Sequence, residues 1–204
     1  MKNSGYFIVA TDTGVGKTLI SAWLMLHLDA DYWKPLNSGS EYDTHTMKDL
    51  TRLPPDRFHK EAHLLTSPLS IHEAARRDGI AIKLQDLIPP STHRPLIIES
   101  AGGIMSPLNE QDQTTTLDQI DHFGLPTILV ARTTLGTLSQ TLCAIDVMAH
   151  RNIKPKAIIL SGPYHPSNAQ ALSDWKGCPP IIEFPQIGEL SCQTLQSIPL
   201  PLGI

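Results

Sequence analysis

The chain has 204 residues, 41% of them hydrophobic, which excludes a wholly disordered protein and is enough for a substantial core. Sixteen basic and 20 acidic residues give a net charge of −4, and with aromatic residues at 5% this composition disfavours nucleic-acid binding. Three cysteines without a C-x-x-C pair disfavour a disulfide framework or a zinc knuckle and favour a reducing compartment, the cytoplasm. Apolar stretches such as Thr127–Ala131 are far too short to span a bilayer, and the few residues before the glycine-rich motif are not those of a signal peptide.

Short apolar runs recur along the chain, separated by turn residues and by helical patterns. The runs predict six strands, at residues 6–10, 31–35, 95–99, 127–131, 156–160 and 180–184. Helical patterns follow the first and the fourth strand, at residues 19–28 and 141–149. Apolar strands that alternate with helices are typical of a parallel sheet covered on both faces. The predicted fold is therefore an α/β three-layer sandwich with a mostly parallel central sheet.

The whole chain, residues 1–204, is expected to form one such domain. Residues 40–94 are polar and have the weakest pattern, and we expect helices there that cover the edge of the sheet carrying the site. Within them, His59 and His63 are four residues apart, but their order is not H-E-x-x-H, so a solvated helix face is favoured over a zinc site. Residues 191–204 are rich in proline and are expected to form a C-terminal strap.

The strongest motif follows the first strand and opens the first helix, and it reads Thr11-Asp-Thr-Gly-Val-Gly-Lys-Thr18. Glycines let backbone N–H groups surround a phosphate, and the helix N-terminus adds the positive end of its dipole. Lys17 would reach the β- and γ-phosphates of a nucleotide, and the hydroxyl of Thr18 would ligate Mg²⁺. Because Thr11 stands where the strict G-x-x-x-x-G-K-[ST] motif has its first glycine, we predict a variant P-loop, of the kind found in P-loop NTPase-like folds.

Charged side chains follow two further strands. Glu99 ends an apolar strand before Ala101-Gly-Gly103, where a carboxylate can hold Mg²⁺ and small residues let a phosphate approach. Lys34 lies beside Pro35 in the second predicted strand, where it suits charge neutralisation on a transferring phosphoryl group; the alternative is an edge-strand lysine that discourages aggregation. Asp43 is a further carboxylate candidate, with a helix N-cap as its alternative. Because ligands gather at the carboxyl ends of parallel strands, these groups are expected to converge at one edge of the sheet.

In this order the motifs resemble those of the dethiobiotin synthetase family, a P-loop family of biotin biosynthesis. The resemblance covers ordered segments between residues 6 and 150. These segments are Thr11–Thr18, Lys34–Glu41 with Asp43 after it, Pro68–Ala75, Glu99–Gly103 with Pro107–Leu108, and Leu135–Leu138.

The resemblance implies an ATP-dependent carbon–nitrogen ligase that forms the ureido ring of dethiobiotin from 7,8-diaminopelargonate, CO₂ and ATP. The family reaction passes through a carbamate and a carbamic–phosphoric anhydride. The resemblance also implies Mg²⁺ as cofactor and a cytoplasmic homodimer, with small molecules rather than nucleic acid or membrane as partners.

The same resemblance assigns individual residues. Lys17 and Lys34 would be catalytic, and Mg²⁺ would be held by Thr18, Asp43 and Glu99. The substrate would be bound by Thr13 and Ser38 and, across the dimer interface, by Gly136, Thr137 and Leu138. The nucleotide would be bound by Gly14, Val15, Gly16, Lys17, Thr18, Leu19, Glu99, Ser100, Ala101, Gly102, Ser161, Phe184, Pro185, Gln186 and Glu189.

Three serines depart from the family pattern. Ser100 replaces a glycine, Ser139 an asparagine, and Ser161 an asparagine that reads adenine. A homologue that binds nucleotide but has lost catalysis is therefore one alternative. A P-loop ATPase switch of the partitioning or septum-site class is another, but that class carries a lysine early in its loop, where this chain has Thr11–Thr13.

Overall fold

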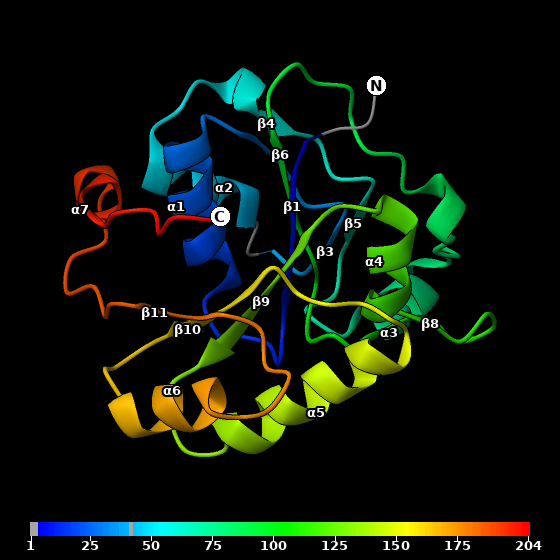
Figure 1. Ribbon diagram of the computed structural model, residues 1–204. Coiled ribbons are helices and arrows are strands. Elements are labelled where there is room, and N and C mark those ends of the chain that lie inside the picture. The colour runs from blue at the N-terminus through cyan, green and yellow to red at the C-terminus, as the bar shows by residue number, and fades with distance from the viewer. Residues whose placement is uncertain (1–3, 41–42) are drawn as a thin grey trace.

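The apolar runs of the sequence form the strands of one parallel sheet (Figure 1), in a computed structural model that describes residues 4–40 and 43–204. The sheet has seven strands in the order β11-β10-β9-β1-β6-β2-β4, and each strand pairs in parallel with its neighbours. The strands are β1 (Gly5–Ala10), β2 (Asp31–Trp33), β4 (Phe58–His59), β6 (Leu96–Glu99), β9 (Thr127–Arg132), β10 (Ala157–Ser161) and β11 (Ile181–Phe184). The predicted parallel sheet is confirmed, and its edge strand β4 joins it from a segment expected to be helical.

Helices cover both faces of this sheet, because successive side chains of each strand point to opposite sides. Phe7 and Val9 of β1 face one apolar cluster, whereas Ile8 and Ala10 face another. The first cluster is closed by α3 (Ile71–Asp78), α4 (Thr116–Phe123), α5 (Thr137–His150) and α6 (Pro166–Ser173). The second is closed by α1 (Lys17–Leu28), α2 (Asp43–Thr51) and α7 (Cys192–Ser197). The α/β three-layer sandwich is thereby confirmed (Figure 1).

The second predicted strand is shorter than expected, since β2 ends at Trp33. Pro35 has no N–H to donate to a ladder, and the chain leaves the main sheet there. It continues as β3 (Leu36–Ser38), which pairs in parallel with β5 (His63–Leu65) in a separate two-stranded sheet. Lys34 therefore lies directly after β2 rather than within it.

Residues 40–94 combine helices with strands, so the expectation of helices alone is wrong for this segment. Besides α2 and α3 it contains β4, β5 and two short 3₁₀ helices, η1 (Pro55–Arg57) and η2 (Leu84–Asp86). His59 lies in β4 and His63 in β5, not on one helix face as expected. Their spacing is compatible with a helix, but pairing with β2 and β3 decides the outcome. The assignment of residues 1–204 to one domain stays a prediction.

The end of the chain packs back on the first helix. The expected strap includes α7, and Trp23 Nε1 of α1 donates a hydrogen bond to the carbonyl oxygen of Ile198 at 2.9 Å. The strands β7 (Pro107–Asn109) and β8 (Thr114–Thr115) form a separate antiparallel hairpin. None of the helices in the described part of the chain is long and apolar enough to cross a membrane.

The carboxyl ends of the strands meet at one edge of the sheet. Among the strands of the main sheet, β9 comes next after β6 along the chain. In the sheet, however, β6 and β9 lie on opposite sides of β1. Such a reversal opens a crevice at the carboxyl end of the central strand, where ligands of α/β proteins bind. The loop after β1 occupies this position and contains the glycine-rich motif.

Candidate active site

The loop between β1 and α1 has the conformation of a phosphate-binding loop. Gly14 has φ of 70° and Gly16 has φ of 102°, values in the left-handed region that favours glycine. A Cβ atom on Gly16 would also lie 2.7 Å from Ser161 Oγ, so that hydroxyl would have to move aside. Gly16 is the N-cap of α1, and no side chain caps this helix end. The free N–H groups and the helix dipole therefore make the loop suited to an anion.

Lys17 lies beside this loop with its ammonium group held by carbonyl oxygens. Its Nζ donates to the carbonyl oxygen of Gly102 at 2.9 Å and lies 3.4 Å from that of Asp12. The residue is only 7% exposed. Burial lowers the pKa of Lys17 to about 8, although the carboxylate of Glu99 opposes this change. The ammonium form still prevails at pH 7, so the group is available to a phosphate.

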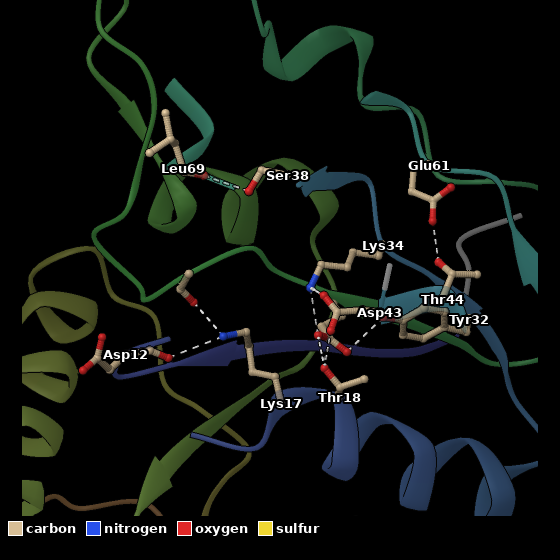
Figure 2. Close-up of polar contacts among 12 residues, drawn as sticks. Asp12, Lys17, Thr18, Tyr32, Lys34, Ser38, Asp43, Thr44, Glu61 and Leu69 are labelled. Atoms are coloured by element: carbon tan, nitrogen blue, oxygen red, sulfur yellow. Dashed lines mark hydrogen bonds and ion pairs between the residues drawn. The ribbon is translucent and has the colours of Figure 1, made fainter. Parts of the chain in front are cut away.

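Four side chains form what we call the lysine–carboxylate cluster: Thr18, Lys34, Asp43 and Glu99. Thr18 Oγ1 lies 2.9 Å from Asp43 Oδ1 and 3.0 Å from Glu99 Oε1. Lys34 Nζ lies 3.0 Å from Glu99 Oε1 and also forms an ion pair with Asp43 Oδ2. Figure 2 shows Lys34, Asp43 and Thr18 together, with Lys17 close by on the loop. The structure thus brings together, from α1, α2, β6 and the turn after β2, four residues that the sequence analysis selected.

Electrostatics explains how this cluster holds buried charges. Lys34 is 5% exposed and Glu99 is fully buried. Burial disfavours the ammonium form of Lys34, but the carboxylates of Glu99 and Asp43 outweigh it and raise the pKa of Lys34. Lys34 therefore remains a cation throughout the physiological range.

The oxygen atoms of this cluster fit a magnesium ion. Asp43 Oδ1 and Glu99 Oε1 lie 2.9 and 3.0 Å from the Thr18 hydroxyl, so three oxygen atoms stand together. Mg²⁺ prefers hard oxygen ligands and is commonly held by one or two carboxylates together with substrate phosphates. Within residues 4–40 and 43–204, no group of three or more His, Cys, Asp or Glu side chains is suited to a metal ion. The candidate set is therefore two carboxylates and a hydroxyl beside the phosphate loop.

A cavity of about 740 Å³ opens above the loop and the cluster. Its volume lies in the range of small-molecule sites. The sequence-selected residues that line it are Thr13, Gly14, Gly16, Lys17, Thr18, Leu19, Lys34, Ser38, Asp43, Glu99, Ala101 and Gly102. Ser38 is fixed by a hydrogen bond from its Oγ to the carbonyl oxygen of Leu69 at 2.8 Å (Figure 2).

Other selected residues lie outside the lining of this cavity. Val15 and Ser100 are buried, and the ring of Phe184 packs edge-on against Trp23 at 5.2 Å between ring centroids. Ser161 ends β10 beside Gly16. The remaining ones are Pro185, Gln186 and Glu189 in the C-terminal part, and Gly136, Thr137 and Leu138 at the start of α5. Their binding roles stay predictions, and Glu41, the last residue of the Lys34 motif, lies outside the described residues.

Sequence patterns alone do not identify several residues of the site. Leu50 of α2 and Leu190 of the C-terminal segment line the large cavity. Arg132, at the end of β9, donates through Nη2 to Asp12 Oδ2 at 2.7 Å, while Asp12 Oδ1 accepts from the N–H of Thr13 at 2.7 Å. These contacts hold the start of the phosphate loop. They depend on which strands are neighbours, and no local motif signals them.

A second cavity of about 520 Å³ lies on the other side of Thr13. It is lined by Asp12 and Thr13 from the loop, by residues 103–107, and by Ser139 and Gln140 of α5. The loop is therefore accessible from two sides.

Comparison with known proteins agrees with the geometry. A family model described as an AAA domain matches residues 4–194. The ATP-dependent dethiobiotin synthetase of Paramagnetospirillum magneticum is 40% identical over 198 residues, which cover 97% of this chain and 95% of that protein. That of Afipia carboxidovorans is 39% identical over 193 residues, which cover 93% of this chain and 91% of that protein. A ParA family ATPase from Chlorobium tepidum matches with a TM-score of 0.54 and 16% identity over 97% of this chain and 93% of its own, a likeness of fold alone.

Proposed function

Because the chain belongs to the family of ATP-dependent dethiobiotin synthetases, we propose that it closes the ureido ring of dethiobiotin from 7,8-diaminopelargonate, CO₂ and ATP. It is an ATP-binding ligase of biotin biosynthesis, and the carbon–nitrogen ring closure is the reaction we assign to it. The observation that carries the proposal is the convergence of Lys17 and the lysine–carboxylate cluster on one cavity beside the phosphate loop.

The reaction has three bond-forming steps. An amine nitrogen of diaminopelargonate attacks CO₂ and loses a proton, which gives a carbamate. A carbamate oxygen attacks the γ-phosphorus of ATP, and the bond to ADP breaks. The second amine then attacks the carbamate carbon, phosphate leaves with the carbon–oxygen bond electrons, and the nitrogen loses a proton. Each step builds or shifts negative charge on oxygen atoms, and the attacking groups belong to the substrate, so fixed positive charges can act without a protein nucleophile.

The two lysines supply these charges in the proposal. Lys17 lies next to the phosphate loop and would neutralise the phosphoryl group that is transferred. Lys34, which stays protonated, would neutralise the carbamate and the same phosphoryl group. Both are positioned before any substrate arrives, which keeps the cost of reorganisation low.

Thr18, Asp43 and Glu99 would hold Mg²⁺ in this proposal, because their oxygen atoms converge beside the loop. When bound, the ion would neutralise charge on the β- and γ-phosphates. Thr13 and Ser38 line the same cavity and would position the carbamate end of diaminopelargonate.

A homodimer in the cytoplasm is part of the proposal. In the proposal, Gly136, Thr137 and Leu138 at the start of α5 act in the site of a partner chain. Leu135, next to them, is 98% exposed. Gel filtration with light scattering would test the dimer.

The activity can be tested with diaminopelargonate, ¹³C-bicarbonate and Mg-ATP, followed by mass detection of the product. We expect dethiobiotin that carries the label, with equal amounts of ADP, phosphate and product. Hydrolysis of ATP without labelled product would favour the ATPase switch. Nucleotide binding without either reaction would favour a homologue that has lost catalysis. Lys176→Ala, at an exposed position away from the site, is the matched control for Lys17→Ala.

A further inference from the structure

Tyr32 places a hydroxyl group underneath the lysine–carboxylate cluster. It lies in β2, is fully buried, and belongs to the apolar cluster beneath α1 and α2. Its ring packs edge-on against that of Phe58, with 6.4 Å between the ring centroids. The hydroxyl donates to Glu99 Oε2 at 3.0 Å (Figure 2). A phenylalanine would fill the same space, so packing alone does not explain the hydroxyl.

The two carboxylate oxygens of Glu99 have different surroundings. Oε1 faces the cavity side, with Thr18 Oγ1 and Lys34 Nζ each at 3.0 Å. Oε2 faces inward and accepts the Tyr32 hydroxyl. Because Glu99 is fully buried, its orientation is set by these partners rather than by solvent. Loss of the inward partner would leave Oε2 buried without this donor, and the carboxylate would rotate toward other partners.

We propose that Tyr32 is a positioning residue: its hydroxyl holds Glu99 Oε2 so that Oε1 is presented to the divalent cation of the nucleotide. The proposal rests on the metal-binding role proposed for Glu99. Hydrogen bonds to carboxylate ligands from outside the metal site are known to tune metal affinity, typically by about 10- to 100-fold.

The test compares Tyr32→Phe with Tyr6→Phe. Tyr6 is partly buried against the same apolar cluster, so its variant removes a comparable hydroxyl away from Glu99. Mn²⁺ binding is measured by electron paramagnetic resonance in the presence of a non-hydrolysable ATP analogue, together with the melting temperature. We expect Tyr32→Phe to weaken Mn²⁺ binding about tenfold or more, and Tyr6→Phe to leave it unchanged. A lowered melting temperature with unchanged Mn²⁺ affinity would assign Tyr32 a structural role and overturn the proposal.

A double-mutant cycle shows whether Tyr32 acts through Glu99. The effect of Tyr32→Phe on Mn²⁺ affinity is measured in the wild-type and in the Glu99→Gln background. If Tyr32 acts through Glu99, the effect disappears in the second background. An equal effect in both backgrounds contradicts the proposal. Wild-type Mn²⁺ affinity in Glu99→Gln itself would instead contradict the metal-binding role of Glu99, so the two failures can be told apart.

Discussion

The predicted phosphate end of the nucleotide site, residues 11–18 with the lysine–carboxylate cluster, differs sharply from the predicted base end, Ser161 with residues 184–189. At the phosphate end the charged side chains are paired with carbonyl oxygens, carboxylates or each other. At the base end the side chains do not line the large cavity, and Phe184 is part of the core. From this contrast we predict that the chain recognises mainly the part of the nucleotide that all nucleoside triphosphates share.

Energetic reasons favour strong recognition of the phosphates and weak recognition of the base. Backbone N–H groups and buried ammonium groups interact with a triphosphate whichever base it carries. Discrimination between bases needs side-chain or backbone groups that would be left unpaired by the wrong base. Ser161 offers a short hydroxyl that both donates and accepts, whereas an asparagine amide would match one base edge.

The largest effects are expected at the phosphate end. Lys17→Ala and Glu99→Gln should each reduce the rate of ring closure by about 100-fold or more, since fixed charges near a transferring group contribute a few kcal/mol. Because Glu99 is fully buried, glutamine is the substitution that keeps its volume. Turnover is measured with circular dichroism as the check on folding, and Lys176→Ala is the control. Near-normal turnover in either variant would contradict the role proposed for that residue in ring closure.

A slightly smaller and more selective effect is expected for Lys34→Gln. If Lys34 acts on the carbamate and the phosphoryl group, kcat falls about 100-fold while the affinity for Mg-ATP changes only a few-fold. ATP titration and ring-closure kinetics on the same preparation measure both quantities. Parallel losses in kcat and in ATP affinity would show that Lys34 serves nucleotide binding instead.

The sequence predicts the phosphate end better than the rest because its chemistry lies in contiguous motifs. Residues 11–18 form a loop between a strand and a helix, which local patterns recognise, and Glu99 is marked by the apolar run before it. Tyr32 carries no such mark, because its role depends on the pairing of β2 with β6, two strands far apart in the chain. The register of that pairing puts Trp33 opposite Ile98 and brings Glu99 within reach.

Residues 40–94 are the least predictable part of the chain, because their strands also depend on pairing with distant strands. The i, i+4 spacing of His59 and His63 fits a helix, yet both residues lie in short strands. Strands of two or three residues gain their stability from neighbours already in place, so local periodicity carries little information about them. Pro35, by contrast, marks the end of β2 directly, because it has no N–H to donate to a ladder.

A pH-dependent effect should sharpen the assignment of Lys17 at the phosphate end. The pKa of about 8 means that the free protein loses this positive charge above pH 8, whereas nucleotide binding requires it. The affinity for Mg-ATP should therefore be nearly constant below about pH 7 and fall about tenfold between pH 7 and 9. Lys17→Arg, whose side chain stays protonated, is the comparison, and calorimetric titration across this range is the measurement. A pH dependence of the same size in Lys17→Arg would place the titrating group elsewhere.

At the base end a small gain is expected from Ser161→Asn. An amide at this position would add a pair of hydrogen bonds to one base and should raise the preference for ATP several-fold, with little change in the rate of ring closure. Competition between ATP and CTP for binding measures the change. No shift in preference would mean that Ser161 does not contact the base.

The most direct test of the central claim, that the phosphate end supplies most of the nucleotide affinity, is kcat/KM for ATP, GTP, CTP and UTP in the same ring-closure assay. We predict that GTP, CTP and UTP each support turnover within about tenfold of ATP, a difference of about 1.4 kcal/mol. A preference for ATP of about a thousandfold or more would contradict it, because the base end would then supply several kcal/mol that its side chains do not explain.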